Sequence, residues 1–441
     1  MRNGLMVGVL SSALAIAALA QGNPAPSRVE AEVTLGAVAQ HTPSPTTEQQ
    51  VTLDDLVREA LEKNPGVQAR LRLAEARRHR APQARLLPDP VVSAAWMGNA
   101  TPFDVQEGDP SSYRSLSVTQ QFPLGGKRGL RASIAEREAD ATWWQYQRER
   151  WRLVAEVKAA FYEVFYARKA LEITATNQDL LRKLSRIAEA RYEVGKGMQQ
   201  DVLRSHVEQT KLEHRITVLE QQEDTAQARL NALLGRGPES PLAPLAPVRA
   251  SELPRTLEEL YLLARDNDPE VQMEQRLIER GEYALRLAGK QTVPDLSVGY
   301  TYQNRPGMPE MHGGMISVNL PIFSRSKQRE MVAEATLELE SARRSREDRF
   351  NNLYFEIKEQ YLAARSSEHL VRLFSQGVVP QSSLALESSM SAYQVGTADF
   401  LTLLTNFTTL LDYESEYYRE LANLQIALAR LEPLVGVELT K

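Results

Sequence analysis

The sequence contains no cysteine, and this absence excludes several kinds of site. Disulfide bonds, thiolate metal ligands and cysteine nucleophiles all require a thiol side chain. A lipid attached to an N-terminal cysteine is excluded for the same reason, so we predict that the chain is not lipidated.

Charge of one sign is not concentrated anywhere in the chain of 441 residues. The 52 Lys and Arg and the 57 Asp and Glu residues give a formal net charge of −5 and are mixed along the whole length. Nucleic-acid binding needs a basic patch that faces the phosphates, and no such block is present. We therefore predict no nucleic-acid partner.

Long hydrophobic runs are also scarce. One apolar run, from about Leu5 to Leu19, ends in the small-x-small pattern of a secretory cleavage site. It is shorter than the roughly 20 residues that span a bilayer, which favours a signal peptide at 1–20 over a membrane anchor. Residues 21–50 are rich in Pro, Ser, Thr and Gln and are predicted to form a flexible segment.

Glycine and proline are missing from two very long stretches. Residues 130–194 and 198–234 contain neither, and apolar residues such as Leu153 and Val157 recur at steps of three and four. This spacing predicts amphipathic helices, and about 65 helical residues would rise about 100 Å. With the glycine-containing turn between them, they predict an antiparallel helical hairpin over about 127–234.

The chain contains one unit twice, because segments of the first half recur about 200 residues later. Such self-similarity indicates an internal repeat. We predict a first repeat at 51–235, a proline-rich connector at 236–254, and a second repeat at 255–441 with its hairpin at about 325–432. The matched segments are 52–68 with 256–272, 87–93 with 293–299, 121–128 with 319–326, and the Tyr-x-Val-Gly turns at 192–195 and 393–396.

Each repeat also has two stretches in which apolar and small polar residues alternate, which predicts strands at about 90–122 and 294–321. Alternation suits a soluble sheet packed on a core as well. Aromatic residues near the strand ends, such as Trp96 and Tyr300, favour a membrane barrel instead. Since four strands cannot close a barrel, the chain must pool its strands with other copies.

The second long helical stretch differs from the first at one place. It contains Gly377 and Pro380, whose counterparts in the first repeat are Thr176 and Asp179. A proline inside a helix removes a hydrogen bond and clashes with the preceding turn. We predict a break or kink there that acts as a hinge above the second turn.

In their order and duplication these motifs resemble the TolC family of outer-membrane efflux proteins. The resemblance covers 51–437 and is carried by Pro88-Asp89, Pro294-Asp295, "FPLGGKR" and both Tyr-x-Val-Gly turns. It implies an α+β membrane protein, a trimer whose twelve strands close an outer-membrane β-barrel that continues as a long periplasmic α-helical barrel. It also implies a Gram-negative outer membrane, with outer-membrane lipid, a periplasmic membrane-fusion adaptor and an inner-membrane pump of the RND type as partners.

The resemblance assigns the repeated turns to the periplasmic tips, where the duct narrows and the adaptor docks. Asp201 occupies the position of a family acid in the first tip, and Asp399 substitutes in the second, which has Thr402 at that position. Three copies would turn such an acid into a ring that selects cations. The alternative is that both acids are simply solvated. The tip residues are Tyr192, Val194, Gly195, Tyr393, Val395 and Gly396.

The segments "PDPVVSAAWMG" and "FPLGGKRGLR" further resemble the heavy-metal branch of that family, the CusC- and CzcC-like proteins. Thioether and imidazole groups, which suit Cu(I) or Ag(I), gather in and after the loop of the second strand pair. The alternative is that they are merely the tip of a strand hairpin. They are Met308, Met311, His312 and Met315.

No catalytic motif is complete. The six histidines form no H-E-x-x-H pattern, and Ser324-x-x-Lys327 lacks the partner motifs of serine acyltransferases, so Ser324 is expected to cap a helix. We predict that the chain is not an enzyme and needs no cofactor. The predicted function is a passive, trimeric outer-membrane efflux duct for heavy-metal cations. The alternative is a soluble periplasmic coiled-coil adaptor or scaffold protein.

Overall fold

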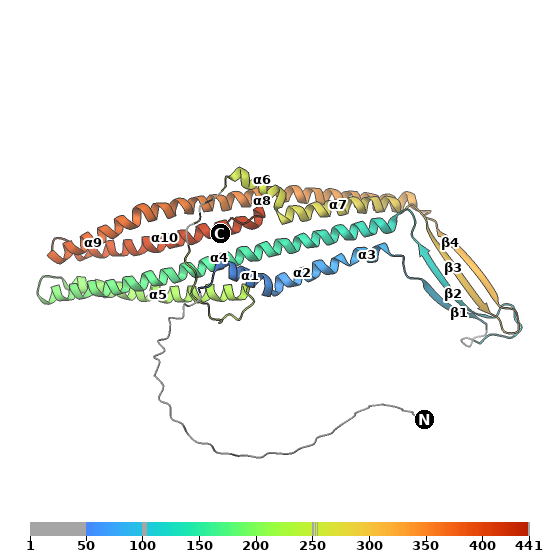
Figure 1. Cartoon of the computed structure of the whole chain (residues 1–441), viewed down its shortest axis with the longest axis horizontal. Helices are drawn as coiled ribbons and strands as arrows, with labels where there is room; N and C mark the ends of the chain where they lie inside the picture. Colours follow the sequence, from blue (N-terminus) through green and yellow to red (C-terminus); the bar gives the residue numbers. More distant parts are fainter. Residues whose placement is uncertain (1–49, 99–103, 249–250, 252, 254, 440–441) are drawn as a thin grey trace, which may run out of the picture. The chain divides into compact units, whose positions relative to one another are not determined.

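The computed structural model describes residues 50–98, 104–248, 251, 253 and 255–439. All of them belong to one compact unit, in which a long helical body carries a four-stranded sheet at one end (Figure 1). The predicted signal peptide at 1–20 and all but the last residue of the predicted flexible segment at 21–50 lie outside the described residues. None of the described helices is long and apolar enough to cross a membrane.

The first repeat folds into short helices, two strands and a helical hairpin. Thr52 and Asn64 cap the first two helices, and Pro65 restricts the backbone before it, so that a new helix begins there. Uninterrupted helix-forming sequence then gives α4, with 67 residues. The elements are α1 Leu53–Lys63, α2 Pro65–Arg78, α3 Arg80–Arg85, β1 Val91–Met97, β2 Tyr113–Phe122, α4 Lys127–Glu193 and α5 Gln199–Leu233.

The second repeat follows the same order. Thr256 forms a capping box, and Asp268 caps the helix that begins at Pro269. Ser324 is the first residue of η1 and Phe323 holds the N-cap position, so the predicted cap is wrong. The elements are α6 Leu257–Asn267, α7 Pro269–Lys290, β3 Asp295–Asn304, β4 Met311–Asn319, η1 Ser324–Gln328, α8 Arg329–Leu373, η2 Phe374–Val378, α9 Val379–Val395 and α10 Phe400–Val435.

Gly377 and Pro380 do not break the second long helix. The chain passes from α8 through the π-helical turn η2 into α9, and Val379 keeps φ −64° and ψ −49°. Pro380 follows the wider turn, where the hydrogen-bond pattern has already shifted, so its missing N–H is accommodated. The counterparts Thr176 and Asp179 lie in regular helix. A π-turn thus replaces the predicted break, and the hinge stays a prediction.

The four predicted strands are present and form one antiparallel sheet in the order β1-β2-β3-β4. Strands β2 and β3 come from different repeats and pair with Phe122 opposite Leu296. One face is apolar and exposed, as at Val92 and Ile316, which are 62% and 74% exposed. Among the described residues, no strand lies beside the outer edges of β1 and β4. A single copy therefore leaves an apolar face and two edges open.

The core runs along the helices instead of filling one centre. One cluster joins α1, α4 and α5 around Val157, and another near the turns joins α4 and α10 around Leu184 and Phe407. Lys158 of α4 and Glu432 of α10 add a buried ion pair at 2.7 Å. Apolar and ionic contacts together hold the two repeats side by side.

Candidate functional site

The two Tyr-x-Val-Gly turns lie side by side at the end of the helical body opposite the sheet (Figure 1). The first joins α4 to α5, and the second joins α9 to α10. A cavity of about 350 Å³ is lined by residues of both turns. The tips of the two hairpins therefore form one site.

Glycine closes both turns by adopting a left-handed backbone. Gly195 has φ 73° and Gly396 has φ 87°, a region that costs other residues roughly 1–2 kcal/mol. Their amides donate to the carbonyls of Tyr192 at 2.9 Å and Tyr393 at 3.1 Å. The two tyrosines differ, because Tyr192 is 47% exposed whereas Tyr393 is 3% exposed and packs its ring 5.5 Å from that of Phe400.

Arg191, near the end of α4, ties the first turn to the second. Its guanidinium donates to the carbonyls of Tyr393 and Gln394, the latter at 3.2 Å, and to that of Lys196 at 3.3 Å. It also lies over the Tyr393 ring, 4.8 Å from the centroid. The carbonyls of Tyr393 and Gln394 are among the last of α9, where the helix dipole favours a cation. Arg191 thus holds the tips of the two hairpins together.

No motif in the sequence points to Arg191, although the duplication carries a signal for it. The second repeat has Ala392 at the equivalent position, so the cation is present in one of the two turns and absent from the other. A difference between otherwise matched turns indicates a contact between them, since a local role in the turn would recur in both.

The two predicted constriction acids have different surroundings. Asp399 is the N-cap of α10, and its carboxylate accepts from the amide of Thr402 at 2.9 Å. Hydrogen bonds from Thr402, above all from its side chain, lower the pKa of Asp399. Asp201 lies half-buried in the first turn of α5. Burial raises the pKa of Tyr393, and the nearby charge of Asp201 raises it further.

Within one copy, the cavity between the turns is not an acidic site. Asp201 and Asp399 line it together with the cations Arg191, Lys196 and Arg204. The charge of Arg204 contributes to the lowered pKa of Asp399. The two acids therefore face compensating positive charge in each copy. An acidic ring would form only when several copies assemble around one axis, and it stays a prediction.

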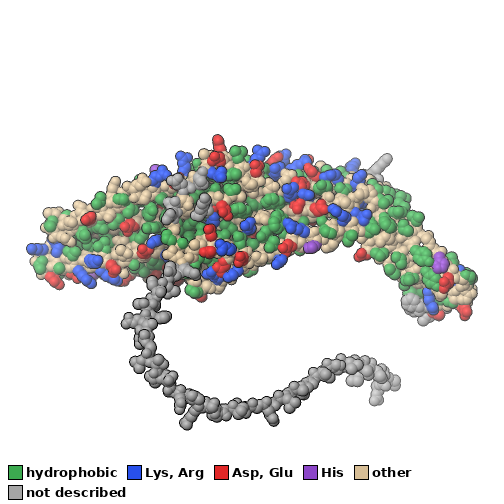
Figure 2. Space-filling view, viewed as in Figure 1, with side chains coloured by type: hydrophobic (Ala, Val, Ile, Leu, Met, Phe, Trp, Pro, Cys, Tyr) green, Lys and Arg blue, Asp and Glu red, His purple; other side chains and the backbone are tan. Residues whose placement is uncertain are grey.

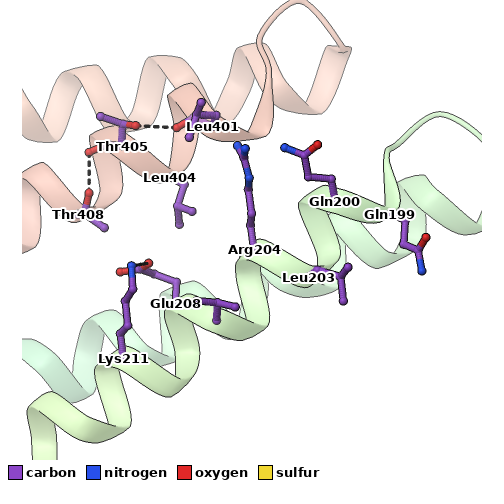
Figure 3. A pocket seen from close by; sticks show the side chains of 11 residues that line it. Gln199, Gln200, Leu203, Arg204, Glu208, Lys211, Leu401, Leu404, Thr405 and Thr408 are labelled. Atoms are coloured by element: carbon purple, nitrogen blue, oxygen red, sulfur yellow. Dashed lines mark hydrogen bonds and ion pairs between the residues drawn. The ribbon is translucent and has the colours of Figure 1, made fainter.

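A groove lies next to the tips between α5 and α10 (Figure 3). Its volume is about 760 Å³. Figure 3 shows the side chain of Arg204 extending from α5 toward α10. Leu203, Val207 and Leu401 line the groove and are exposed. Apolar walls beside charged side chains are typical of a protein interface.

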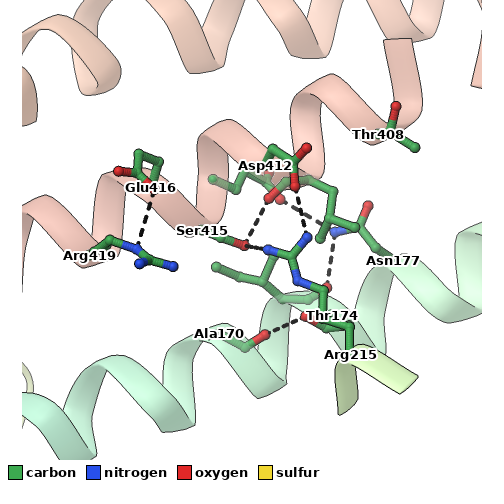
Figure 4. Close-up of polar contacts among 12 residues, drawn as sticks. Ala170, Thr174, Asn177, Arg215, Thr408, Asp412, Ser415, Glu416 and Arg419 are labelled. Carbon is green, nitrogen blue, oxygen red and sulfur yellow. Dashed lines mark hydrogen bonds and ion pairs between the residues drawn. The ribbon is translucent and has the colours of Figure 1, made fainter. Parts of the chain in front are cut away.

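Farther from the tips, a polar cluster links α10 to both helices of the first hairpin (Figure 4). Arg215 of α5 forms an ion pair with Asp412 at 2.8 Å and donates to Ser415 at 3.0 Å. Asn177 of α4 donates to Glu414 at 3.4 Å, and burial raises the pKa of Glu414. The polar cluster therefore holds the second hairpin against the first between the tip contact of Arg191 and the buried pair of Lys158 and Glu432.

Most of the chain matches one known protein family. The family model described as outer membrane efflux protein matches residues 56–236 and 260–437, one block in each repeat. The chain belongs to the outer membrane efflux protein family. The description names efflux, which is transport and not catalysis, in agreement with the prediction that the chain is not an enzyme.

Individual relatives in the family are distant. Protein CyaE of Bordetella pertussis is 26% identical over 251 residues, 53% of this chain and 52% of CyaE, so the chain spans about half the length of the curated relative it matches. The structure of VceC from Vibrio cholerae has a TM-score of 0.73 and 17% identity, covering 88% of this chain and 97% of VceC. The structure of CusC has a TM-score of 0.74 and 15% identity, covering 87% and 92%. At these identities the structures establish the fold alone, and they do not single out the heavy-metal branch.

The thioethers and the imidazole considered for soft metals lie on both faces of β4 and in the loop before it. Met308 lies in the loop after β3, and the other three residues lie on β4. Alternation along the strand places Met311 and Met315 on one face and His312 on the other, where His312 hydrogen-bonds Tyr300 at 2.6 Å. Among the described residues, no group of three His, Asp or Glu side chains could hold a metal ion. Met311 and Met315 therefore lie on the opposite face from His312, and a soft-metal site at these residues stays a prediction.

Asp399→Ala is expected to remove the cap of α10 and speed amide exchange in its first turn several-fold, whereas Asp399→Asn should keep the cap. Because the folded-state pKa of Asp399 is lowered from 3.8, its stabilisation is present above pH 3.8 and is lost as the pH falls through the folded-state pKa. Hydrogen exchange at pH 5 and pH 3, corrected for intrinsic rates, measures both effects. Wild-type exchange in Asp399→Ala would contradict the capping role.

Proposed function

We propose that three copies of this chain form an outer-membrane efflux duct. The duct conducts substrates passively to the outside from a periplasmic adaptor and an inner-membrane pump of the RND type. The four strands of each copy close a twelve-stranded barrel in the outer-membrane lipid. The helices continue this barrel as a second, α-helical barrel across the periplasm.

The four-stranded sheet is the main observation that supports this proposal. Its apolar face is exposed, as at Val92, Val118 and Ile316, and its two outer edges have no partner strand among the described residues. Figure 2 shows hydrophobic side chains at the surface where the helical body meets the sheet and over the sheet itself. In water such a sheet is prone to edge pairing and aggregation. A barrel in lipid requires these features, because apolar side chains face outward and every edge is paired.

In this assembly the tips form the periplasmic constriction and the adaptor docking surface. Exposed apolar tip side chains, Val194 and Val395 among them, and the neighbouring groove support docking there. Threefold repetition would turn Asp201 and Asp399 into acidic rings near the axis, which favour cations. The π-turn above the second tip, at Gly377, supplies the place where that hairpin bends.

Membrane fractionation tests the duct against the alternative, a soluble periplasmic adaptor or scaffold. We expect the chain in outer-membrane fractions alone and, after detergent extraction, as a trimer that dissociates on heating. Release by osmotic shock as a soluble monomer would support the alternative. An insertion of the strands into lipid explains the first result, and a sheet that stays in water explains the second.

We propose heavy-metal cations as the substrates, on the basis of the strand segments that resemble the heavy-metal branch and of the acidic tips. A deletion strain should become sensitive to divalent or monovalent metal ions, and the intact gene should restore resistance. A susceptibility panel that sets metals beside drugs and dyes measures this. Sensitivity to hydrophobic drugs alone would refute the metal assignment and leave the duct intact.

Pro380→Ala is expected to lower the frequency of channel opening several-fold without loss of trimers. The substitution restores the missing N–H, so the π-turn can relax toward a regular and stiffer helix. Single-channel recording in planar bilayers measures the opening frequency. Gln381→Ala, at the exposed neighbouring position, is the matched control and should behave as wild type. Equal gating in the two variants would show that η2 is not a hinge.

A further inference from the structure

Another cavity lies where the sheet meets the helices, at the end of the helical body opposite the tips (Figure 1). It lies between the ends of α7 and β4 and the starts of α4, β3 and α8. Its volume of about 350 Å³ falls in the range of about 300–1,000 Å³ that is typical of small-molecule sites. The cavity is therefore large enough for a small ligand or for the headgroup of a larger one.

Gln328, the last residue of η1, has a polar atom without a partner at this cavity. The residue is 8% exposed, and its Oε1 accepts no hydrogen bond from any described residue. A buried acceptor without a donor destabilises a protein, so nearly all such atoms find a partner. The Oε1 of Gln328 can therefore accept a hydrogen bond from a ligand in the cavity.

Lys327, next to Gln328, supplies the positive charge of the cavity. Lys127 and Asp295 also line it, but they pair with each other at 2.8 Å and compensate each other's charge. Lys327 is exposed and forms no ion pair with a described residue. One uncompensated cation thus lies beside one unpartnered acceptor.

The segment that leaves β4 gives the cavity an apolar rim. Leu320, Ile322 and Phe323 line the cavity and are 65%, 77% and 71% exposed. Figure 2 shows hydrophobic side chains at the surface in this region, where the helical body meets the sheet. Exposed apolar side chains that cluster in this way mark contacts with a membrane or a partner. In the proposed duct this segment passes from the membrane-spanning strands to the periplasmic helices, at the level of the phospholipid headgroups.

The first repeat lacks the two polar side chains. The match between the strand exits, extended by two residues, places Leu130 at the position of Gln328 and a glycine at that of Lys327. The first repeat also enters α4 directly, whereas the π-helical turn η1 precedes α8. Because the first repeat passes from strand to helix with an apolar residue at this position, the fold does not require a glutamine there. The difference indicates a role in binding, and π-turns are frequent at functional sites.

We propose that this cavity binds the headgroup of a phospholipid that carries a phosphate and a primary ammonium, as phosphatidylethanolamine does. The phosphate pairs with Lys327, the lipid ammonium donates to Oε1 of Gln328, and the acyl chains lie along the apolar rim. A phosphate alone would leave Gln328 without a donor, so the ligand needs both groups. The inference rests on the proposed function, because only strands that enter lipid bring the cavity to a membrane surface.

Lipid titration of the delipidated full-length chain in detergent, followed by native mass spectrometry, tests the site. We expect phosphatidylethanolamine to bind about tenfold more tightly than phosphatidylcholine, whose methylated ammonium has no N–H to donate. Gln328→Met keeps the size of the side chain and removes the acceptor, so it should lose this preference. Lys327→Ala should weaken both lipids several-fold, because both carry the phosphate. Lys290→Ala, which removes an exposed lysine at the end of α7, is the matched control and should bind as wild type.

Thermal unfolding shows that the variants are folded and identifies the source of the ligand. Lipid-free Gln328→Met should unfold at or above the wild-type temperature, and phosphatidylethanolamine should raise the Tm of the wild type more than that of the variant. A lipid preference that the wild type lacks, or that Gln328→Met keeps, would overturn the site and leave an outer-membrane trimer intact. An equal rise in Tm with O-phosphoethanolamine, the same headgroup without acyl chains, would overturn the lipid assignment. A chain found in soluble fractions alone would overturn the duct on which the inference rests.

Discussion

Replacing Lys158 with alanine is expected to lower the free energy of unfolding by about 3–5 kcal/mol, because it leaves a buried carboxylate without its cation. The Lys158 Nζ lies 2.9 and 2.7 Å from the two carboxylate oxygens of Glu432, and the side chains are 6% and 0% exposed. Glu432 also accepts from the amide of Leu439 at 2.9 Å, so the segment after α10 should loosen as well. Thermal unfolding of the detergent-solubilised protein, followed by circular dichroism, measures the loss as a large fall in Tm.

Two further variants show whether burial is the cause. Lys158→Met combined with Glu432→Leu removes both charges at similar volume and should recover most of the lost stability. Arg344→Ala breaks an exposed ion pair with Glu347 and should leave Tm unchanged. If Lys158→Ala unfolded at the same temperature as Arg344→Ala, the buried pair would contribute no more than a surface pair does.

The sequence predicted the elements of the fold because helices and strands follow local rules. Period-two alternation located the strands, and the long stretches without Gly and Pro located α4 and α5. At Gly377 and Pro380 the local rule predicted a break or kink, and the interruption takes the form of a π-turn that does not end the helix. Side-chain contacts between the two repeats could not be predicted from such local patterns. Lys158 and Glu432 lie 274 residues apart, and only packing of α4 against α10 brings them together.

The sequence predicted where the tip site lies, but it did not predict the contacts between the two tips. The repeated turns and the acids Asp201 and Asp399 were located by the duplication, and they do line one cavity. Asp399 also precedes an apolar helical run directly after a turn, and this pattern is an N-cap signal. Arg191 acts on the other hairpin, so no pattern within its own helix indicates its role.

Arg191→Ala is expected to release the second tip from the first and to raise the open probability of the duct. The lost interactions are charge-assisted hydrogen bonds to the carbonyls of Tyr393 and Gln394 and the contact with the Tyr393 ring. Hydrogen bonds to a charged group contribute about 1.5–3 kcal/mol, so the ratio of closed to open channels should fall by about ten- to a hundredfold. Arg191 is only partly buried, and water replaces part of the loss, so the lower end of this range applies. Single-channel recording in planar bilayers gives the open probability.

Two control variants show whether the change in gating comes from the shape of the guanidinium group, from its positive charge, or from the loss of any arginine on α4. Arg191→Lys keeps a cation at the end of α9 but loses the second nitrogen, which donates to the Lys196 carbonyl while the first donates to those of Tyr393 and Gln394, so its gating should be intermediate. Arg186→Ala removes an exposed arginine from the same helix and should behave as wild type. Wild-type gating by Arg191→Ala, with the proposed trimer intact, would mean that the tip contact does not hold the closed state. In that case Arg215→Ala, which breaks the ion pair with Asp412 farther up the hairpins, should open the duct instead.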